Sequence, residues 1–273
     1  MKTKKWITYT IYGILITAVF LYLRFPSDSA GRYIKSIVEA GNPNIILLID
    51  SARPCLLPGI RLGNVEIGFR DKPDLIIRMS VLKLQPAIIN LFSGKLTLLL
   101  NATAYEGHIK TNIGFTNHFS CKGPVKIKAE FNDINLGKCS SIKTATGREV
   151  DGKFGGTMSY NGKWDRIISG TGNANIALLD GNIQLLGDIF GLNEVNFDKV
   201  EADVTLKNRT LKINRLEMAG GQLSGSFNGD VSLNENIMQS RLAIKGDVEV
   251  HALGKKISTI LKGTVANPVP RFM

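Results

Sequence analysis

Residues 125–136 read VKIKAEFNDINL, and this stretch decides the fold. Its apolar and polar residues alternate strictly over the first eight positions. The apolar ones are Val125, Ile127, Ala129 and Phe131, and the polar ones between them are Lys126, Lys128, Glu130 and Asn132. A period of two places successive side chains on opposite faces of a strand, so the stretch predicts a β-strand with one face buried and one in water.

The same alternation returns along most of the chain after residue 45. It is clear in VEADVTLKN, LKINRLEM, QLSGSFNGDVSLN and SRLAIKGDVEV, and less clean in LIIRMSVLKL and KLTLLLNATAY. Dipeptides typical of hairpin turns separate or follow these runs: Asn161-Gly162, Asp180-Gly181, Gly220-Gly221 and Asn228-Gly229. We expect about twelve to fourteen short strands in an antiparallel meander. No alternation of strands and helices is present, which disfavours a Rossmann or TIM-barrel architecture.

Three short helices are expected between the strands, where they could cap sheet edges. The first follows Pro86 in QPAIINLFSG, because proline is favoured in the first turn of a helix. The second lies in NIQLLGDIFG, where Ile183, Leu186 and Ile189 share a helical face. The third lies in ALGKKISTILKG, before the C-terminal tail.

The N-terminal segment predicts a membrane anchor. Three lysines precede 18 uncharged residues, 6–23, and Arg24 follows. A helix of that length spans about 27 Å, which is enough for a bilayer core, and the aromatic residues Trp6, Tyr9 and Tyr22 lie near its two ends, with Leu23 as its last residue. The lysines favour a cytoplasmic N-terminus at residues 1–5. The alternative is a cleaved signal peptide, but the apolar stretch is longer than usual and no A-x-A site follows it.

Residues 24–41 predict a short amphipathic helix directly after the anchor. Ser27 or Asp28 could cap its start, and Gly41 would end it. Its apolar residues are Tyr33, Ile34, Ile37 and Val38. Two arrangements are open: the helix lies on the lipid surface, or it closes one end of the sheet. Residues 42–273 then form the β domain.

Charge and cysteine content narrow the functional classes. The net charge is +11 and the pI about 9.6, but no basic run with interleaved aromatics follows residue 5, so an anionic membrane surface is a better partner than nucleic acid. The three cysteines, Cys55, Cys121 and Cys139, include no CxxC pair or Cys/His ligand set, which argues against zinc or thiol-redox chemistry. A Cys121–Cys139 disulfide is possible, and free buried thiols are the alternative.

A search for catalytic chemistry finds no motif. His108, His118 and His251 lie in separate regions, and no HExxH, GxSxG, Walker A or GxGxxG sequence is present. The acidic residues are scattered, so we expect no enzyme, no metal and no cofactor. An alternating sheet must cover its apolar face, either with a filled core or as an apolar groove that could hold an acyl chain.

The order of several short motifs resembles a known family. They are YLRFP (Tyr22–Pro26), PCLLPGIRLGNVEIGF (Pro54–Phe69), LKLQPAIINLFSGKLTLLLNATAYEGHI, GGQLSGSFNGDVSLN and LKGTVANPVPRF. RFP after the anchor and ANP near the end are the more specific pieces. This order is similar to that of the type II secretion system protein N (GspN) family, which itself resembles the AsmA-like proteins of the Gram-negative envelope.

The resemblance implies a single-pass protein of the bacterial inner membrane with a periplasmic domain. That domain would be a bent antiparallel meander sheet, an AsmA-like trough with a few short capping helices. The implied role is non-catalytic, in assembling the type II secretion system, with membrane lipids and other secretion subunits as partners. The alternative is an AsmA-like lipid-binding or lipid-handling protein, although AsmA-like lipid transporters are often far longer than 273 residues.

The C-terminal tail predicts a structural latch that closes the last edge of the sheet. Its residues are Asn267, Pro268, Pro270 and Phe272. Asn267 precedes a proline and is pushed to extended geometry, and neither proline can donate to a strand ladder. We therefore expect the tail to lie along the last strand or at the groove mouth, with Phe272 as its apolar anchor.

Overall fold

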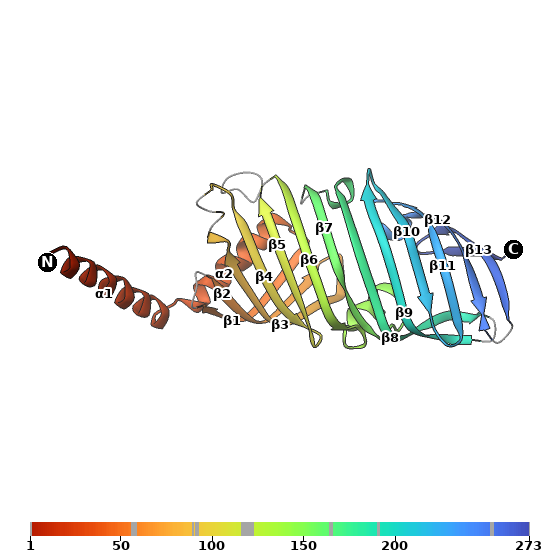
Figure 1. Cartoon of the computed structure of the whole chain (residues 1–273), viewed down its shortest axis with the longest axis horizontal. Helices are drawn as coiled ribbons and strands as arrows, with labels where there is room; N and C mark the ends of the chain where they lie inside the picture. Colours follow the sequence, from red (N-terminus) through yellow and green to blue (C-terminus); the bar gives the residue numbers. More distant parts are fainter. Residues whose placement is uncertain are drawn as a thin grey trace.

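The fold is a single antiparallel sheet of fourteen strands, arranged in the order in which they occur in the sequence (Figure 1). This is a computed structural model, and it describes residues 2–55, 59–88, 90, 93–115, 123–163, 166–189, 192–251 and 254–272. The strands are β1 Ile45–Pro54, β2 Ile60–Phe69, β3 Lys72–Pro86, β4 Thr97–Ala104, β5 Gly107–Phe115, β6 Pro124–Asn135, β7 Lys153–Lys163, β8 Thr171–Ile189, β9 Leu192–Lys207, β10 Thr210–Ala219, β11 Leu223–Ser232, β12 Arg241–Val250, β13 Lys255–Thr264 and β14 Pro268–Phe272.

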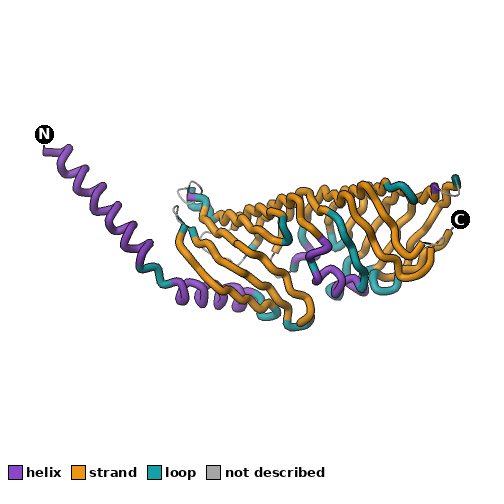
Figure 2. The backbone as a smooth tube through the Cα atoms, turned by 90° about the horizontal axis from the view of Figure 1, so that it is seen from below, coloured by secondary structure: helices purple, strands orange, loops and turns teal. Residues whose placement is uncertain are grey.

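The predicted meander is therefore confirmed, and so is the antiparallel pairing. Every strand pairs with its neighbours in sequence, which leaves β1 and β14 as the two edges of an open sheet. The sheet is twisted and curls toward the side on which the short helix α4 (Ser140–Thr146) lies (Figure 2). Three short 3-10 helices are also present: η1 Leu136–Lys138, η2 Ile167–Ser169 and η3 Ile237–Gln239.

Two longer helices precede the sheet. The first, α1 (Lys2–Leu23), occupies the segment expected to anchor the chain and extends away from the sheet (Figure 1). None of the helices that the structure describes meets the length and apolarity needed to cross a membrane. The second, α2 (Ser27–Gly41), follows Pro26, whose carbonyl accepts the N–H of Ala30. Neither Ser27 nor Asp28 caps it with a side chain, which corrects the expected N-cap.

Helix α2 packs on the sheet at its β1 end, which agrees with the second of the two arrangements left open by the sequence. Its residues Ala30, Ile34 and Val38 follow one another at intervals of four, and all three pack against the core at β1 to β4. Tyr33 and Ile37, which the sequence grouped with this face, point away and remain 67% and 46% exposed. The helix ends at Gly41, as expected.

Two of the three expected interstrand helices are strands instead. Residues 182–189 belong to β8, and Ile183 lies opposite Val195 of β9. Residues 255–264 form β13, in which Ile257, Thr259 and Leu261 alternate onto one face and pair with β12. Pairing with an existing strand outweighed a helical spacing of apolar residues in both segments. In the first segment, Ile88 and Asn90 are helical, while residues 89, 91 and 92 lie outside the described part.

Three of the four expected hairpin turns lie inside strands. Asn161-Gly162 belongs to β7, Asp180-Gly181 to β8 and Asn228-Gly229 to β11, whereas Gly220-Gly221 separates β10 from β11. At Gly229 the reason is a close approach of the next strand. Its φ is +151°, and a Cβ there would lie 2.2 Å from the carbonyl oxygen of Ala243. The glycine thus serves sheet packing and not a turn.

Candidate functional site

One continuous apolar row crosses all fourteen strands, and it is the basis of the candidate site. The strand registers place these residues directly beside one another from β1 to β14: Ala52, Leu62, Leu82, Ala102, Ile109, Phe131, Gly156, Ile176, Ala202, Leu216, Phe227, Gly246, Thr259 and Phe272. Thr259 is the single residue with a polar side chain among them. We call this the central row, and the sheet face that carries it the apolar face.

A second row of the apolar face runs parallel to the central row. It contains Leu84, Leu100, Thr111, Ala129, Met158, Ala174, Val204, Ile213, Gly229, Ile244, Leu261 and Pro270. Both rows arise because the period-two patterns of neighbouring strands are in register, so that every strand contributes its apolar side. The alternation first seen in residues 125–136 thus extends across the whole sheet.

The apolar face is covered at its ends and only partly covered between them. Leu62 and Val65, under α2, are 1% and 0% exposed. At the other end Val195 of the β8–β9 hairpin packs with Leu223 and Val250, and all three are buried. Between these ends Ile109, Phe131 and most other members of the rows are half-buried. No second layer therefore covers the middle of the apolar face within the described residues.

Aromatic residues on the apolar face lie over glycines of adjoining strands and turns. A Cβ on Gly246 would lie 2.4 Å from the Phe227 ring, and a Cβ on Gly170 would lie 2.4 Å from the Tyr160 ring. The missing side chains let the rings lie against the backbone, and such aromatic cover of a glycine stabilises a strand pair. Phe131 and Phe154 add an edge-to-face pair with ring centroids 5.5 Å apart.

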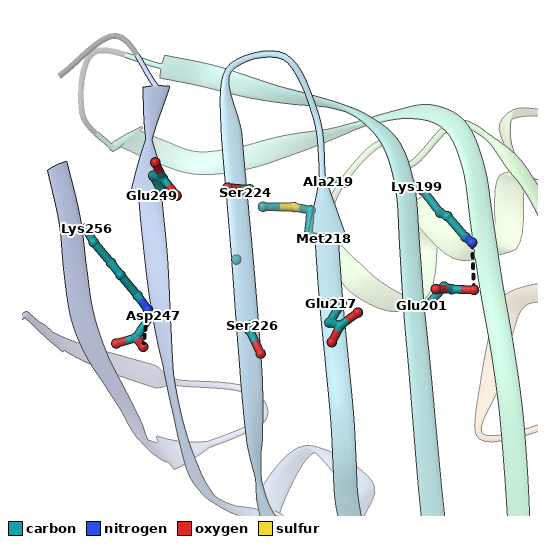
Figure 3. Close-up of a pocket in the computed structure, with 11 residues that line it drawn as sticks. Lys199, Glu201, Glu217, Met218, Ala219, Ser224, Ser226, Asp247, Glu249 and Lys256 are labelled. Atoms are coloured by element: carbon teal, nitrogen blue, oxygen red, sulfur yellow. Dashed lines mark ion pairs between the residues drawn. The ribbon is translucent and has the colours of Figure 1, made fainter. Parts of the chain in front are cut away.

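Two hollows of the sheet lie on the opposite, polar face. One of about 560 Å³ is bordered by Asn101, Lys110, Lys128, Glu130 and Ser159 among others. Another of about 320 Å³ lies across β9 to β13 (Figure 3). Most residues that border these two hollows are polar or charged, so the hollows do not match the expected acyl-chain groove, which would require an apolar lining.

Two carboxylates of the hollow in Figure 3 pair with lysines. Lys199 Nζ lies 2.9 Å from Glu201, and Lys256 Nζ lies 3.1 Å from Asp247. Hydrogen bonds from Ser258 and Lys256 lower the pKa of Asp247, and the bond from Lys199 lowers the pKa of Glu201. No group of three or more His, Cys, Asp or Glu side chains suited to a metal ion is present in the described ranges.

One pair that the sequence did not reveal borders this hollow. Ser224 Oγ lies 3.1 Å from His251 Nε2, and the other ring nitrogen lies 3.0 Å from the carbonyl oxygen of Gly221. The carbonyl can only accept, so Nδ1 carries the proton and Nε2 accepts from the serine. The imidazole is exposed, and the described carboxylates do not bond to it, so the pair fastens the end of β12 to the β10–β11 turn. The register of Ser224 against Glu249 brings the two together, and that register is not visible in the sequence.

The other predicted residues are placed as follows. Trp6, Tyr9 and Tyr22 lie on α1 and are 77%, 73% and 56% exposed, and Leu23 is its last residue. Cys55 and Cys139 are free thiols, while Cys121 and His118 lie outside the described residues.

The predicted latch residues lie at the last edge of the sheet. Asn267 exchanges backbone hydrogen bonds with Thr264, and β14 continues from it. Pro268 lies opposite Gly263, Pro270 opposite Leu261 and Phe272 opposite Thr259. Since hydrogen-bonded and non-hydrogen-bonded pairs alternate from the Thr264–Asn267 pair, both proline nitrogens face away from β13.

No family model, no curated protein and no solved structure matches this chain. Its function must therefore be inferred from the chemistry of the two faces and edges of the sheet.

Proposed function

We propose that this protein is a non-catalytic, membrane-attached component of the bacterial envelope that supports assembly of a type II secretion system. The observation that carries the proposal is the apolar face, which runs across the whole sheet and is only half-buried between its ends. An uncovered apolar surface of this extent is characteristic of a binding surface. The resemblance in motif order to the GspN family names the apparatus in which that surface would act.

Attachment to the inner membrane is part of the proposal, with the sheet on the periplasmic side. Exposed aromatic side chains of α1, including Trp6 and Tyr9, support contact with a lipid interface. Tyr33 and Ile37 on the outer side of α2 extend this exposed apolar surface next to the sheet. The net charge of +11 favours an anionic bilayer surface.

Gene deletion and complementation would test the secretion role. We expect export of the secreted enzymes to fall in the deletion strain and to return with the full chain. A chain whose residues 2–23 are replaced by a cleavable signal peptide should restore it less well, because the sheet would then be free in the periplasm. The full chain should also co-purify with inner-membrane subunits of the apparatus. Normal export without the protein would refute the proposed role.

A second candidate function is binding of lipid acyl chains, and the apolar rows favour it. Leu100 is a half-buried member of the second row, while the neighbouring Asn101 is exposed on the polar face. Native mass spectrometry of the purified chain should show bound phospholipid. Leu100→Asp should reduce the bound fraction, whereas the matched control Asn101→Asp should not. A chain that is repeatedly empty of lipid would exclude this function.

A further inference from the structure

The two edge strands, β14 and β1, differ in the backbone N–H groups that they present to another strand. At β14 the prolines occupy positions whose nitrogens face outward, so this edge offers few backbone donors to another strand. Strand β1 contains one proline, Pro54, which is its last residue, so the rest of the strand keeps its backbone N–H groups. The N–H of Leu47 faces away from β2, since it donates to the carboxylate of Glu39 at 3.3 Å. By alternation the N–H of Ile49 faces the same way.

Helix α2 packs against β1, and a groove lies between the two elements. The groove has a volume of about 280 Å³, and it is bordered by residues 27–35 of the helix and 47–52 of the strand. The helix wall rises about 12 Å from residue 27 to residue 35, and residues 47–52 extend about 17 Å.

The floor and walls of the groove suit an extended chain. A Cβ on Gly31 would meet no atom within 4 Å, so the helix wall is open at its middle. The charged groups that border the groove are Asp28, Arg32, Lys35 and Asp50, two acidic and two basic. Their charges balance, and the Asp50 carboxylate also accepts from the Asn64 amide at 3.1 Å. A neutral strand fits this lining better than an anionic lipid headgroup or a strongly acidic peptide.

We propose that the groove between α2 and β1 binds an uncharged extended segment of another protein, which adds to the sheet as a further strand. The main chain of that segment would pair with Ile49 and its neighbours, and one row of its side chains would lie against Gly31. A second copy of this chain is a poorer occupant, because its own α2 flanks its β1 edge and its β14 edge carries the prolines. This inference does not depend on the proposed role in secretion.

The test uses random seven-residue peptides displayed on phage, selected against the purified full chain in detergent. We expect selected peptides to be poor in charge and to lack proline at their centre. Gly31→Trp, which fills the groove, should weaken their binding at least tenfold, while Gly31→Ala should bind normally. Added peptide should slow hydrogen exchange at Ile49.

Each other outcome overturns the proposal. Failure to select any saturable binder would mean that the edge accepts no strand. Equal binding by the Gly31→Trp chain would place the peptides elsewhere on the molecule. If the wild-type chain dimerises in light scattering and Gly31→Trp makes it monomeric, the occupant is a second copy and not another protein. Circular dichroism of Gly31→Trp, expected to be unchanged, separates blocked binding from loss of the fold.

Discussion

The hydroxyl of Ser141 should hold the unpaired part of β3 in place. Pairing of β3 with β4 begins at Val81, so the preceding residues of β3 have β2 on one side and no strand on the other. There Ser141 Oγ accepts the N–H of Ile76 at 3.1 Å and donates to the carbonyl of the same residue. The serine is 4% exposed, so one buried side chain from α4 replaces a neighbouring strand.

Ser141→Ala removes both hydrogen bonds and leaves the two backbone groups of Ile76 to find water. At a net value near 1 kcal/mol for each bond, we expect a local loss of about 2 kcal/mol, which corresponds to roughly 30-fold faster exchange at the Ile76 amide. The amide of Arg78 should change little, because it donates to the Tyr105 hydroxyl at 3.0 Å.

Hydrogen exchange with residue resolution measures this directly. The matched control is Ser140→Ala, since the neighbouring serine is exposed and its side chain forms no hydrogen bond among the described residues. Unchanged exchange at Ile76 in Ser141→Ala would refute the reasoning. Equal acceleration along all of β3 would show that the helix supports the strand as a unit and not through this hydroxyl.

Three further predictions concern the core, the tail and one ion pair. Leu62→Ala, at 1% exposure, should lower the free energy of unfolding by about 3 kcal/mol, whereas Leu48→Ala, at 49% exposure, should cost under about 1 kcal/mol in denaturant titrations. Deleting residues 264–273 uncovers the β13 edge and should lower the melting temperature and cause aggregation; an unchanged, monodisperse product in light scattering would exclude the latch. Hydrogen bonding from Lys138 lowers the pKa of Glu106 below its usual 4.5, so this pair stabilises the fold above that pH and loses its effect as pH falls through the lowered value. Lys138→Ala should raise the NMR-measured pKa of Glu106 toward 4.5, and a pKa that does not move would assign the shift to Asn135.

The alternating pattern was sufficient to predict most of the sheet. In residues 125–136 each side chain is on the face that the period of two assigned to it up to Phe131. The pattern then fails at Asp133, whose φ of +54° marks a bulge and shifts Ile134 back onto the buried side. A bulge adds one residue to one strand, and its position depends on the partner strand, which a single sequence does not identify.

Spacing alone could not separate strands from helices in the short apolar runs. Ile183, Leu186 and Ile189 fit a helical face, yet the segment continues β8 because β9 offers it a pairing partner. The groove beside α2 was also hidden, since the sequence left open whether that helix lay on lipid or on the sheet. The alternative was decided by packing of Ala30 and its neighbours against β1 to β4, and that contact joins distant parts of the chain.

The meander makes the ends of this sheet its most consequential parts. Each strand pairs only with its neighbours in sequence, so every interior strand has two partners, although part of an interior edge, such as β3 before Val81, has no neighbouring strand. Sheets of this kind approximate linear arrays, in which only the terminal units present unpaired edges to other chains. The prolines of β14 remove backbone donors from that edge. At β1 a groove separates the edge from α2, and Glu39 of the helix accepts the N–H of Leu47. With the β14 edge blocked and the β1 edge accessible, the sheet can be extended in one direction only. A partner strand at β1 would then add to the sheet, and the β14 edge would not pair with further chains.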